Sequence, residues 1–258
     1  MIFSHVTTEV TSLMSQARTI DLVNGEASSG FTMEGYPHRA IFSMPFQGLT
    51  DKGIPTYLNE KGELTSTDLD FQNRNSNGYL IYEGPTEPTI TGSLGNEIKW
   101  KNWRLNVFLT YSFGSYVRLD RIFSAQYNDL TSMTKEFKNR WMQAGDEETT
   151  SVPTILPYRS FASDRNLRIA YNAYNYTSNR TAKGDFVRMK EISLGYDFPK
   201  AILRSTPFTN LSLKLQATNL FLIYADKKLN GQDPEFVNAG GVAAPIPRQF
   251  TMTLKFGL

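Results

Sequence analysis

Gln249-Phe-Thr-Met-Thr-Leu-Lys-Phe-Gly-Leu258 alternates apolar with polar or small residues without interruption. Successive side chains of an extended strand point to opposite faces, so Phe250, Leu254 and Phe256 share one face. Residues 249–258 would rise about 3.3 Å each and, tilted by about 40°, cover roughly 25 Å, the height of the apolar band of a transmembrane β-barrel. The segment therefore predicts a barrel strand on which Phe250, Leu254 and Phe256 face lipid.

A longer stretch of the same pattern predicts a β-hairpin at residues 90–114. A strand at 90–100 is followed by a tight connection at Lys101-Asn102 and a returning strand at 103–114. The residues of the returning strand that we expect to face lipid are Trp103, Leu105, Val107 and Leu109. Its other face is polar apart from Phe108. A register shift of one residue would turn Arg104 towards lipid, at a cost of about 2–4 kcal/mol, so the register is well specified.

Further strands are predicted along the chain. Residues 181–198 change phase, which predicts a β-bulge near Lys190-Glu191, and residues 211–222 alternate regularly. Weaker alternation predicts strands at 2–13 and 36–46. The expected fold class is all-β: an antiparallel transmembrane β-barrel segment of about seven strands, a partial barrel with long extracellular loops and a short loop helix.

The lengths of the connections predict the orientation of this segment. The short connections are 101–102 and 199–210, and the long ones are 47–88, 115–180 and 223–248. If the last strand ends at the periplasm, the short connections lie on the periplasmic side and the long ones outside, as in outer-membrane barrels. The predicted loop helix is 128–143, because Leu130, Met133, Phe137 and Trp141 recur there at helical spacing.

Composition narrows the class of protein. No apolar run among the 258 residues approaches the eighteen or so that a membrane-spanning helix needs. The net charge of +2 gives no electrostatic reason to expect nucleic acid binding, and the absence of cysteine excludes disulfides and thiolate ligands. The first residues have neither the basic start nor the apolar core of an export signal. We therefore expect the chain to be part of a longer protein.

Alternation alone leaves other interpretations open. One is a soluble β-sandwich whose apolar faces meet in a core, with the function of a soluble β-rich carbohydrate-binding module. Another is a secreted hydrolase that uses the loop carboxylates Asp146, Glu147 and Glu148. A connection of about 65 residues is unusual in a compact domain, which favours the barrel.

Several motifs, in order along nearly the whole chain, resemble those of SusC/RagA-type TonB-dependent transporters. Gly184-Asp-Phe-Val-Arg-Met-Lys-Glu-Ile-Ser-Leu-Gly-Tyr-Asp-Phe-Pro199 is similar to a block near the end of that family, in which an Arg precedes a strand of the SLGY type closed by Pro. The other matching segments are 35–42, 48–51, 101–114, 218–221, 233–235 and 247–251.

The resemblance implies an outer-membrane importer of Bacteroidetes type that takes up large nutrients, oligosaccharides or peptides, and is not an enzyme. Such transporters have a barrel of about 22 strands around a plugged lumen, a SusD-like lipoprotein as lid, and the TonB complex as energy source. Residues 1–258 would be the C-terminal part of that barrel, in contact with outer-membrane lipid. Plug, TonB-contact motif and signal peptide would be absent, so TonB would act only through the missing N-terminal part and the segment would be inactive alone.

The candidate site residues are aromatic side chains of the loop 115–180, namely Tyr158, Phe161, Tyr171, Tyr174 and Tyr176. Exposed rings could contact substrate or the lid protein, whereas packing over the barrel rim is the structural alternative. His5 and His38 do not have metal-binding spacing, so no metal site is predicted. No phosphate-binding loop or nucleophile motif occurs, so we expect no cofactor and no catalytic residue.

Overall fold

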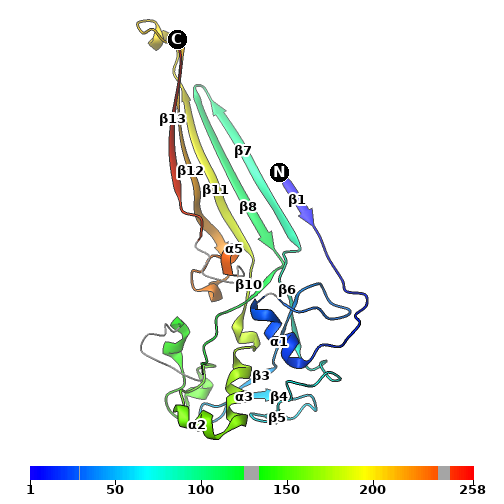
Figure 1. Ribbon diagram of the computed structural model, residues 1–258. Coiled ribbons are helices and arrows are strands. Elements are labelled where there is room, and N and C mark those ends of the chain that lie inside the picture. Colours follow the sequence, from blue (N-terminus) through cyan, green and yellow to red (C-terminus); the bar gives the residue numbers. More distant parts are fainter. Residues whose placement is uncertain (29, 125–133, 238–244) are drawn as a thin grey trace.

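The computed structural model describes residues 1–28, 30–124, 134–237 and 245–258. Its main feature is a six-stranded antiparallel sheet in the order β1-β7-β8-β11-β12-β13. These strands are β1 (Ile2–His5), β7 (Ile90–Trp100), β8 (Trp103–Phe113), β11 (Phe186–Asp197), β12 (Asn210–Ala225) and β13 (Gln249–Gly257). Figure 1 shows the sheet as a long twisted ribbon that rises from a cap of helices and short strands. In the described part of the chain the sheet stays open, with β1 and β13 at its edges.

The register aligns the apolar side chains of neighbouring strands in rows. One row across five strands contains Ile98, Leu105, Leu194, Leu215 and Met252. The adjacent row, on the opposite face, contains Glu97, Asn106, Ser193, Gln216 and Thr251. Both pairings of β11 shift register between Met189 and Glu191, which confirms the predicted bulge. The bulge keeps the two ends of β11 in phase, so that one face stays apolar along its length.

Two glycines of β7 lie opposite aromatic residues of β8. Gly92 lies opposite Tyr111 on the apolar face, and Gly95 lies opposite Phe108 on the polar face. A Cβ atom at Gly95 would stand 3.1 Å from the Phe108 ring, so this ring covers the glycine. Aromatic residues often cover glycine across a strand pair in this way. Phe108 therefore interrupts the polar face because it fills the space above Gly95.

The prediction of about seven sheet strands is wrong in three places. Residues 2–13 contribute only the short β1. Residues 36–46 do not join the large sheet, because β2 (Ala40–Ser43) pairs with β6 (Ile81–Pro85) instead. The strand expected at 181–198 divides into β10 (Thr181–Lys183), which pairs with β9 (Tyr116–Arg118), and β11. The division falls at Gly184-Asp185, where the Asp185 carboxylate accepts a hydrogen bond from the Gly114 backbone N–H at 2.6 Å.

The long connections fold together into the cap at the other end of the sheet from the C-terminus (Figure 1). Its further elements are α1 (Thr19–Ser28), β3 (Phe46–Leu49), β4 (Pro55–Leu58), β5 (Leu64–Thr65), η1 (Lys135–Asn139), η2 (Asp146–Glu148), α2 (Tyr158–Ser163), α3 (Arg165–Tyr174) and η3 (Ser178–Arg180). Leu22, Phe42, Met44 and Tyr57 form a buried core with Ala170 of α3. The Tyr57 hydroxyl donates to the Ala170 carbonyl at 2.6 Å. Segments far apart in sequence thus share one core.

The helix predicted at 128–143 is wrong in its described part. Residues 128–133 lie outside the described residues, and the remainder forms only the short η1 before the backbone becomes extended at Arg140. The regular helices of this connection are α2 and α3. The Asp164 side chain caps α3 by accepting from the backbone N–H groups of Asn166 and Leu167. Two short elements, η4 (Lys227–Leu229) and α5 (Pro234–Val237), follow β12, and α4 (Lys200–Leu203) connects β11 to β12.

Candidate functional site

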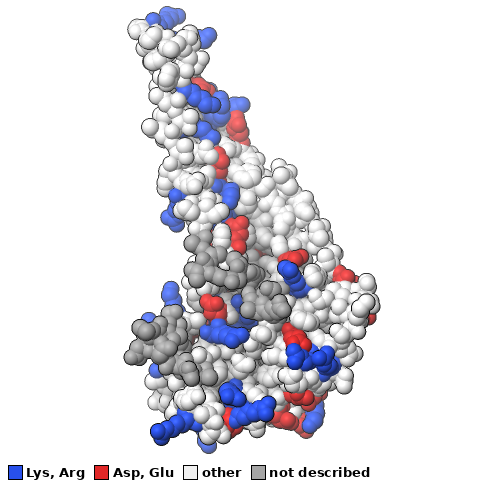
Figure 2. Space-filling model, viewed as in Figure 1, with Lys and Arg blue, Asp and Glu red and all other residues white. Residues whose placement is uncertain are grey.

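The polar face of the large sheet carries interleaved charges of both signs. Arg104 pairs with Asp197 at 3.1 Å and lies 3.9 Å from Glu97, while Lys214 lies 3.8 Å from Glu191. Glu97, Arg104, Asp197 and Lys214 line a cavity of about 350 Å³ on this face. Figure 2 shows basic and acidic residues alternating along the sheet above the cap. This face is suited to water or to a polar partner.

The opposite face presents large apolar side chains without cover. All the residues predicted to face lipid lie on it: Trp103, Leu105, Val107, Leu109, Phe250, Leu254 and Phe256. Phe250 is 76% exposed and Phe256 57% exposed. The two faces of one sheet therefore differ in polarity, although neither is buried by another layer of the described chain. A continuous exposed apolar surface marks a site of contact with another apolar phase or partner.

The connection after β12 is anchored on the polar face by Arg188. This residue of β11 lies beside Thr110 of β8, and its guanidinium contacts the carboxylates of Asp233 at 2.5 Å and Glu235 at 3.0 Å. Arg188 and Asp233 are both almost fully buried. A buried cation needs such a partner, because desolvation without one is costly. The pair therefore holds α5 against the polar face of the sheet, at the end near the cap.

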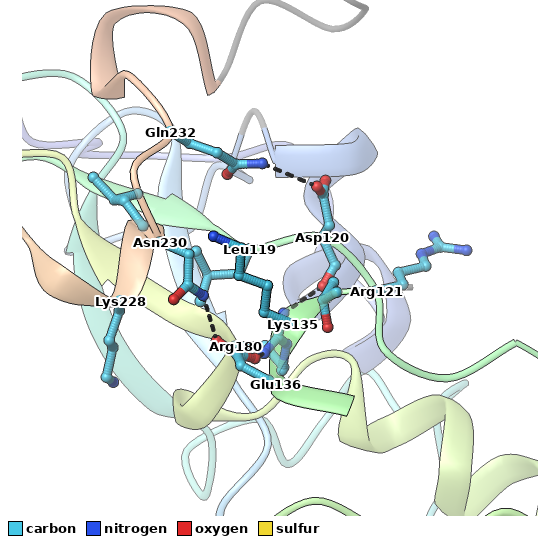
Figure 3. Close-up of a pocket in the computed structure, with 11 residues that line it drawn as sticks. Leu119, Asp120, Arg121, Lys135, Glu136, Arg180, Lys228, Asn230 and Gln232 are labelled. Atoms are coloured by element: carbon cyan, nitrogen blue, oxygen red, sulfur yellow. Dashed lines mark hydrogen bonds and ion pairs between the residues drawn. The ribbon is translucent and has the colours of Figure 1, made fainter. Parts of the chain in front are cut away.

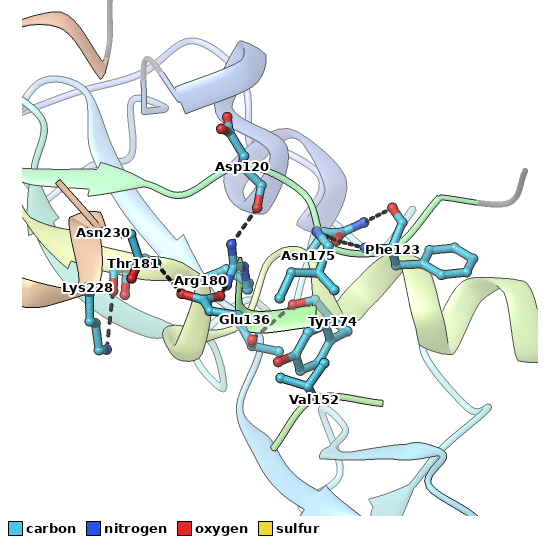
Figure 4. A network of polar contacts seen from close by, with 12 residues as sticks. Asp120, Phe123, Glu136, Val152, Tyr174, Asn175, Arg180, Thr181, Lys228 and Asn230 are labelled. Atoms are coloured by element: carbon cyan, nitrogen blue, oxygen red, sulfur yellow. Dashed lines mark hydrogen bonds and ion pairs between the residues drawn. The ribbon is translucent and has the colours of Figure 1, made fainter. Parts of the chain in front are cut away.

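A second group of polar contacts joins the same connection to the cap (Figure 4). Buried Arg180 of η3 forms an ion pair with Glu136 of η1 and donates to the Asp120 carbonyl at 2.5 Å. Asn230, which follows η4, donates to the other oxygen of Glu136 at 3.1 Å. Three parts of the chain that are distant in sequence thus meet at Glu136.

Buried Asn175 fixes the end of α3 to the segment that follows β9. Its side-chain oxygen accepts from the backbone N–H groups of Ile122 at 3.1 Å and Phe123 at 3.0 Å, and its amide nitrogen donates to the Phe123 carbonyl at 3.1 Å. The side chain mimics a backbone partner and leaves these buried groups satisfied (Figure 4).

Most of the candidate aromatic residues lie in the cap core. Phe161, Tyr171, Tyr174 and Tyr176 are each at most 5% exposed, which is the packed arrangement and not that of exposed rings. Phe161 and Tyr171 pack edge to face with ring centroids 5.1 Å apart. Burial raises the pKa of Tyr174 to about 12. Tyr158, at the start of α2, is 57% exposed and is the one member of the group with an open ring.

The acidic cluster at 146–148 stabilises a turn. Asp146 accepts hydrogen bonds from the backbone N–H groups of Met142 and Gln143, and Glu147 accepts from the Trp141 indole N–H at 2.8 Å. The hydrogen bond from Trp141 lowers the pKa of Glu147. A carboxyl with a lowered pKa is a poor proton donor, so Glu147 is poorly suited to act as a general acid.

The described residues contain no group of three His, Asp or Glu side chains placed to hold a metal ion. His38 contacts the Thr32 hydroxyl at 3.3 Å, and His5 is part of β1.

Within the described ranges, no helix combines the length and the apolar character needed to cross a membrane.

The fold and the two-faced sheet define a class of protein: an open antiparallel segment of a barrel-like wall that carries a folded cap at one end. No protein-family model matches the chain. It is 26% identical to TonB-dependent receptor P3 of Formosa agariphila over 223 residues, and 26% identical to TonB-dependent receptor P39 of the same organism over 194 residues. These alignments cover 85% and 70% of the chain, but only 20% and 17% of the receptors. The chain thus spans about a fifth of the length of the curated relatives that it matches.

Solved structures of the RagAB peptide transporter have the same fold. One matches with a TM-score of 0.59 and 19% identity, over 88% of this chain and 23% of the other. The 'open-open' state of the RagAB peptide importer matches with a TM-score of 0.59 and 17% identity, over 97% of this chain and 25% of the other. Sequence and fold together confirm that the chain resembles SusC/RagA-type TonB-dependent transporters.

The anchoring residue Arg188 was not among the predicted site residues. Its motif block and the Asp233-Pro234-Glu235 segment are both visible in the sequence. Nothing in their spacing indicates that they form a pair, because the contact joins a strand to a connection 45 residues later. The signal in the sequence is that Arg188 lies between the apolar residues Val187 and Met189 of a strand, where a buried cation needs an acidic partner.

Proposed function

We propose that residues 1–258 are the C-terminal wall and outer loops of a TonB-dependent outer-membrane importer of large nutrients, oligosaccharides or peptides. The segment crosses the outer membrane as part of a barrel and performs no catalysis. The polar face of the sheet lines the lumen, and the apolar face contacts lipid. The relatives named TonB-dependent receptors support this assignment.

One observation carries the proposal: a single sheet has a continuous apolar face, which is open, and a polar, charged face on its other side. In a soluble sandwich the apolar face would be covered by a second sheet. In a barrel wall the apolar face meets acyl chains and the polar face meets the aqueous lumen. Strands of 11 residues, such as β7 and β8, are long enough for that crossing.

The arrangement of the connections gives the orientation. The tight turn after β7 and the short connection through α4 lie at one end of the sheet, which we assign to the periplasm. The cap lies at the other end and would face outside. There it could meet a SusD-like lipoprotein and the substrate, with Tyr158 as the candidate contact. The TonB complex would act only through the N-terminal part of such a transporter.

Tryptophan fluorescence offers a direct test of the lipid-facing assignment. The chain has three tryptophans: Trp100 and Trp103 on the apolar face near the tight turn, and Trp141 in the cap. A variant with Trp103 alone (W100F/W141F) and one with Trp141 alone (W100F/W103F) would be refolded into phosphatidylcholine vesicles brominated near the headgroups. Trp103 should be quenched strongly and Trp141 weakly.

Equal, weak quenching of both tryptophans would contradict the assignment. If the chain also stayed monomeric in water without detergent, the soluble carbohydrate-binding module would be favoured instead. A separate uptake assay in vesicles should detect no flux through the chain alone, because an open sheet with edges at β1 and β13 encloses no lumen.

A further inference from the structure

A cavity of about 480 Å³ lies where the cap meets the outer end of the sheet (Figure 3). Its walls come from residues 119–121 after β9, 134–136 around the start of η1, Arg180 of η3, and 228–232 in the connection after β12. We propose that this cavity binds the carboxylate group of an acidic ligand. The proposal rests on the proposed function, since it assigns a substrate class to the same importer.

Among the described residues that line the cavity, basic side chains outnumber acidic ones. The basic ones are Arg121, Lys135, Arg180 and Lys228, and the acidic ones are Asp120 and Glu136. The lining therefore has an excess of two positive charges, as large as the net charge of the whole chain. Clefts lined by one sign of charge attract ligands of the opposite sign.

The two carboxylates already have partners within the protein. Glu136 holds Arg180 through an ion pair and accepts a hydrogen bond from the Asn230 amide. Asp120 accepts from the Gln232 amide at 3.3 Å. Figure 3 shows these contacts at the edge of the cavity, where they join its opposite walls. Glu136 thus neutralises Arg180, and Asp120 is a single negative charge against the three remaining cations.

Those cations have only neutral partners among the described residues. The Lys228 ammonium donates to the Thr181 carbonyl at 3.2 Å, and Arg121 donates to the Tyr176 hydroxyl at 3.2 Å. Exposed Lys135 has no carboxylate within ion-pair distance in the part of the chain that the structure describes. A ligand carboxylate would supply the missing opposite charge, and hydrogen bonds between ionised groups are the stronger ones.

A second cavity of about 370 Å³ shares Leu119, Asp120 and Arg121 with the first and extends the positive region. Arg118 lines this second cavity and donates to the Phe42 carbonyl at 2.6 Å and to the Thr177 carbonyl at 3.1 Å. Burial lowers the pKa of Arg118 to about 10, an effect that the Glu83 carboxylate only partly offsets.

The test compares two lysines on η1. Lys135 lines the cavity and Lys138 does not, and both are exposed, so K135Q and K138Q should fold equally well. Binding of end-blocked triglutamate and of trigalacturonate would be measured by calorimetry, with triglutamine and maltotriose as neutral controls. An acidic probe should bind in preference to its neutral control. K135Q should weaken that binding about tenfold, K138Q should not, and K135R should restore it.

The two acidic probes distinguish the source of the carboxylate. Binding of triglutamate alone assigns acidic peptides, and binding of trigalacturonate alone assigns acidic oligosaccharides. The proposal is overturned if neither acidic probe exceeds its neutral control, or if K135Q and K138Q have the same effect. Tryptophan quenching reports lipid contact and does not involve the cavity, so failure of this proposal and failure of the proposed function are separable.

Discussion

Arg188 on β11 and Asp233 in the connection after β12 form a buried ion pair, with Nη2 and Oδ1 2.5 Å apart. Glu235 contacts the same nitrogen at 3.0 Å, but its side chain is 41% exposed. The pair lies on the polar face of the sheet, so in a barrel it would bring the connection over the lumen side of the wall. The polar face of the sheet is therefore covered by its own chain at the end near the cap.

Removal of the Asp233 carboxylate should release this connection. D233A leaves the Arg188 guanidinium buried without its closer partner, and breaking a buried pair from one side costs about 3–5 kcal/mol. We expect faster trypsin cleavage after Lys227 and Lys228, measured by mass spectrometry. E235Q is the matched control, because an exposed carboxylate contributes about 1 kcal/mol or less. Equal cleavage rates in D233A and E235Q would mean that Asp233 does not anchor the connection.

Opposite faces of the sheet should respond differently to a new charge. In L105R the charge falls on the apolar face, where lipid contact would make it cost about 2–4 kcal/mol. In N106R it falls on the polar face, where Asn106 already lies 3.4 Å from the Glu191 carboxylate. The two proteins would be compared by urea unfolding in lipid vesicles. A loss of stability in L105R with little change in N106R is expected, and the reverse order would place lipid on the other face.

The sequence predicted the strands of the wall well because their pattern is local. Each strand alternates with period two, and the phase change in the sequence of β11 predicts the bulge beside Lys190. Both faces of the wall follow from the same alternation. The prediction that residues 36–46 join the large sheet is wrong, because alternation does not indicate which strand is the partner. β2 pairs with β6 in the cap.

The fold of the cap was less predictable from the sequence, because it depends on contacts between segments that are distant along the chain. The aromatic residues of α3 were interpreted as a possible ligand surface, yet Tyr171 and Tyr174 repeat with Leu167 and Ala170 at helical spacing after an Asp164 cap. That pattern indicated an amphipathic helix with a buried side. The helix packs against Tyr57 of the connection 47–88 and against Met44, which precedes that connection. Local periodicity does not predict such contacts between distant segments.

The two glycines of β7 should differ in their tolerance of a methyl group. A Cβ atom at Gly92 would collide with the Ile2 carbonyl and the Tyr111 hydroxyl, whereas one at Gly95 would meet only the edge of the Phe108 ring. We expect G92A to separate β1 from β7, at a cost of about 1–3 kcal/mol, because backbone cannot move aside as a ring can. Hydrogen exchange at Ile2–His5 should accelerate in G92A and stay near wild type in G95A. Unchanged protection of β1 in G92A would contradict this pairing.

Alkaline pH should weaken the cap through Tyr174. Its pKa rises from 10.0 to about 12 because burial disfavours the phenolate. Above about pH 10 the unfolded chain loses this proton while the folded chain keeps it, so stability is full below that pH and falls as pH rises towards 12. A shift of this size corresponds to about 2–3 kcal/mol in total.

Near-UV circular dichroism with urea, from neutral pH to about pH 11, should record a shallower alkaline loss of stability in Y174F than in the wild-type protein. Part of the loss should persist, because burial also raises the pKa of Tyr57. Y158F, which changes an exposed ring, should follow the wild-type curve, and a Y174F curve of the same slope would rule Tyr174 out as the titrating group.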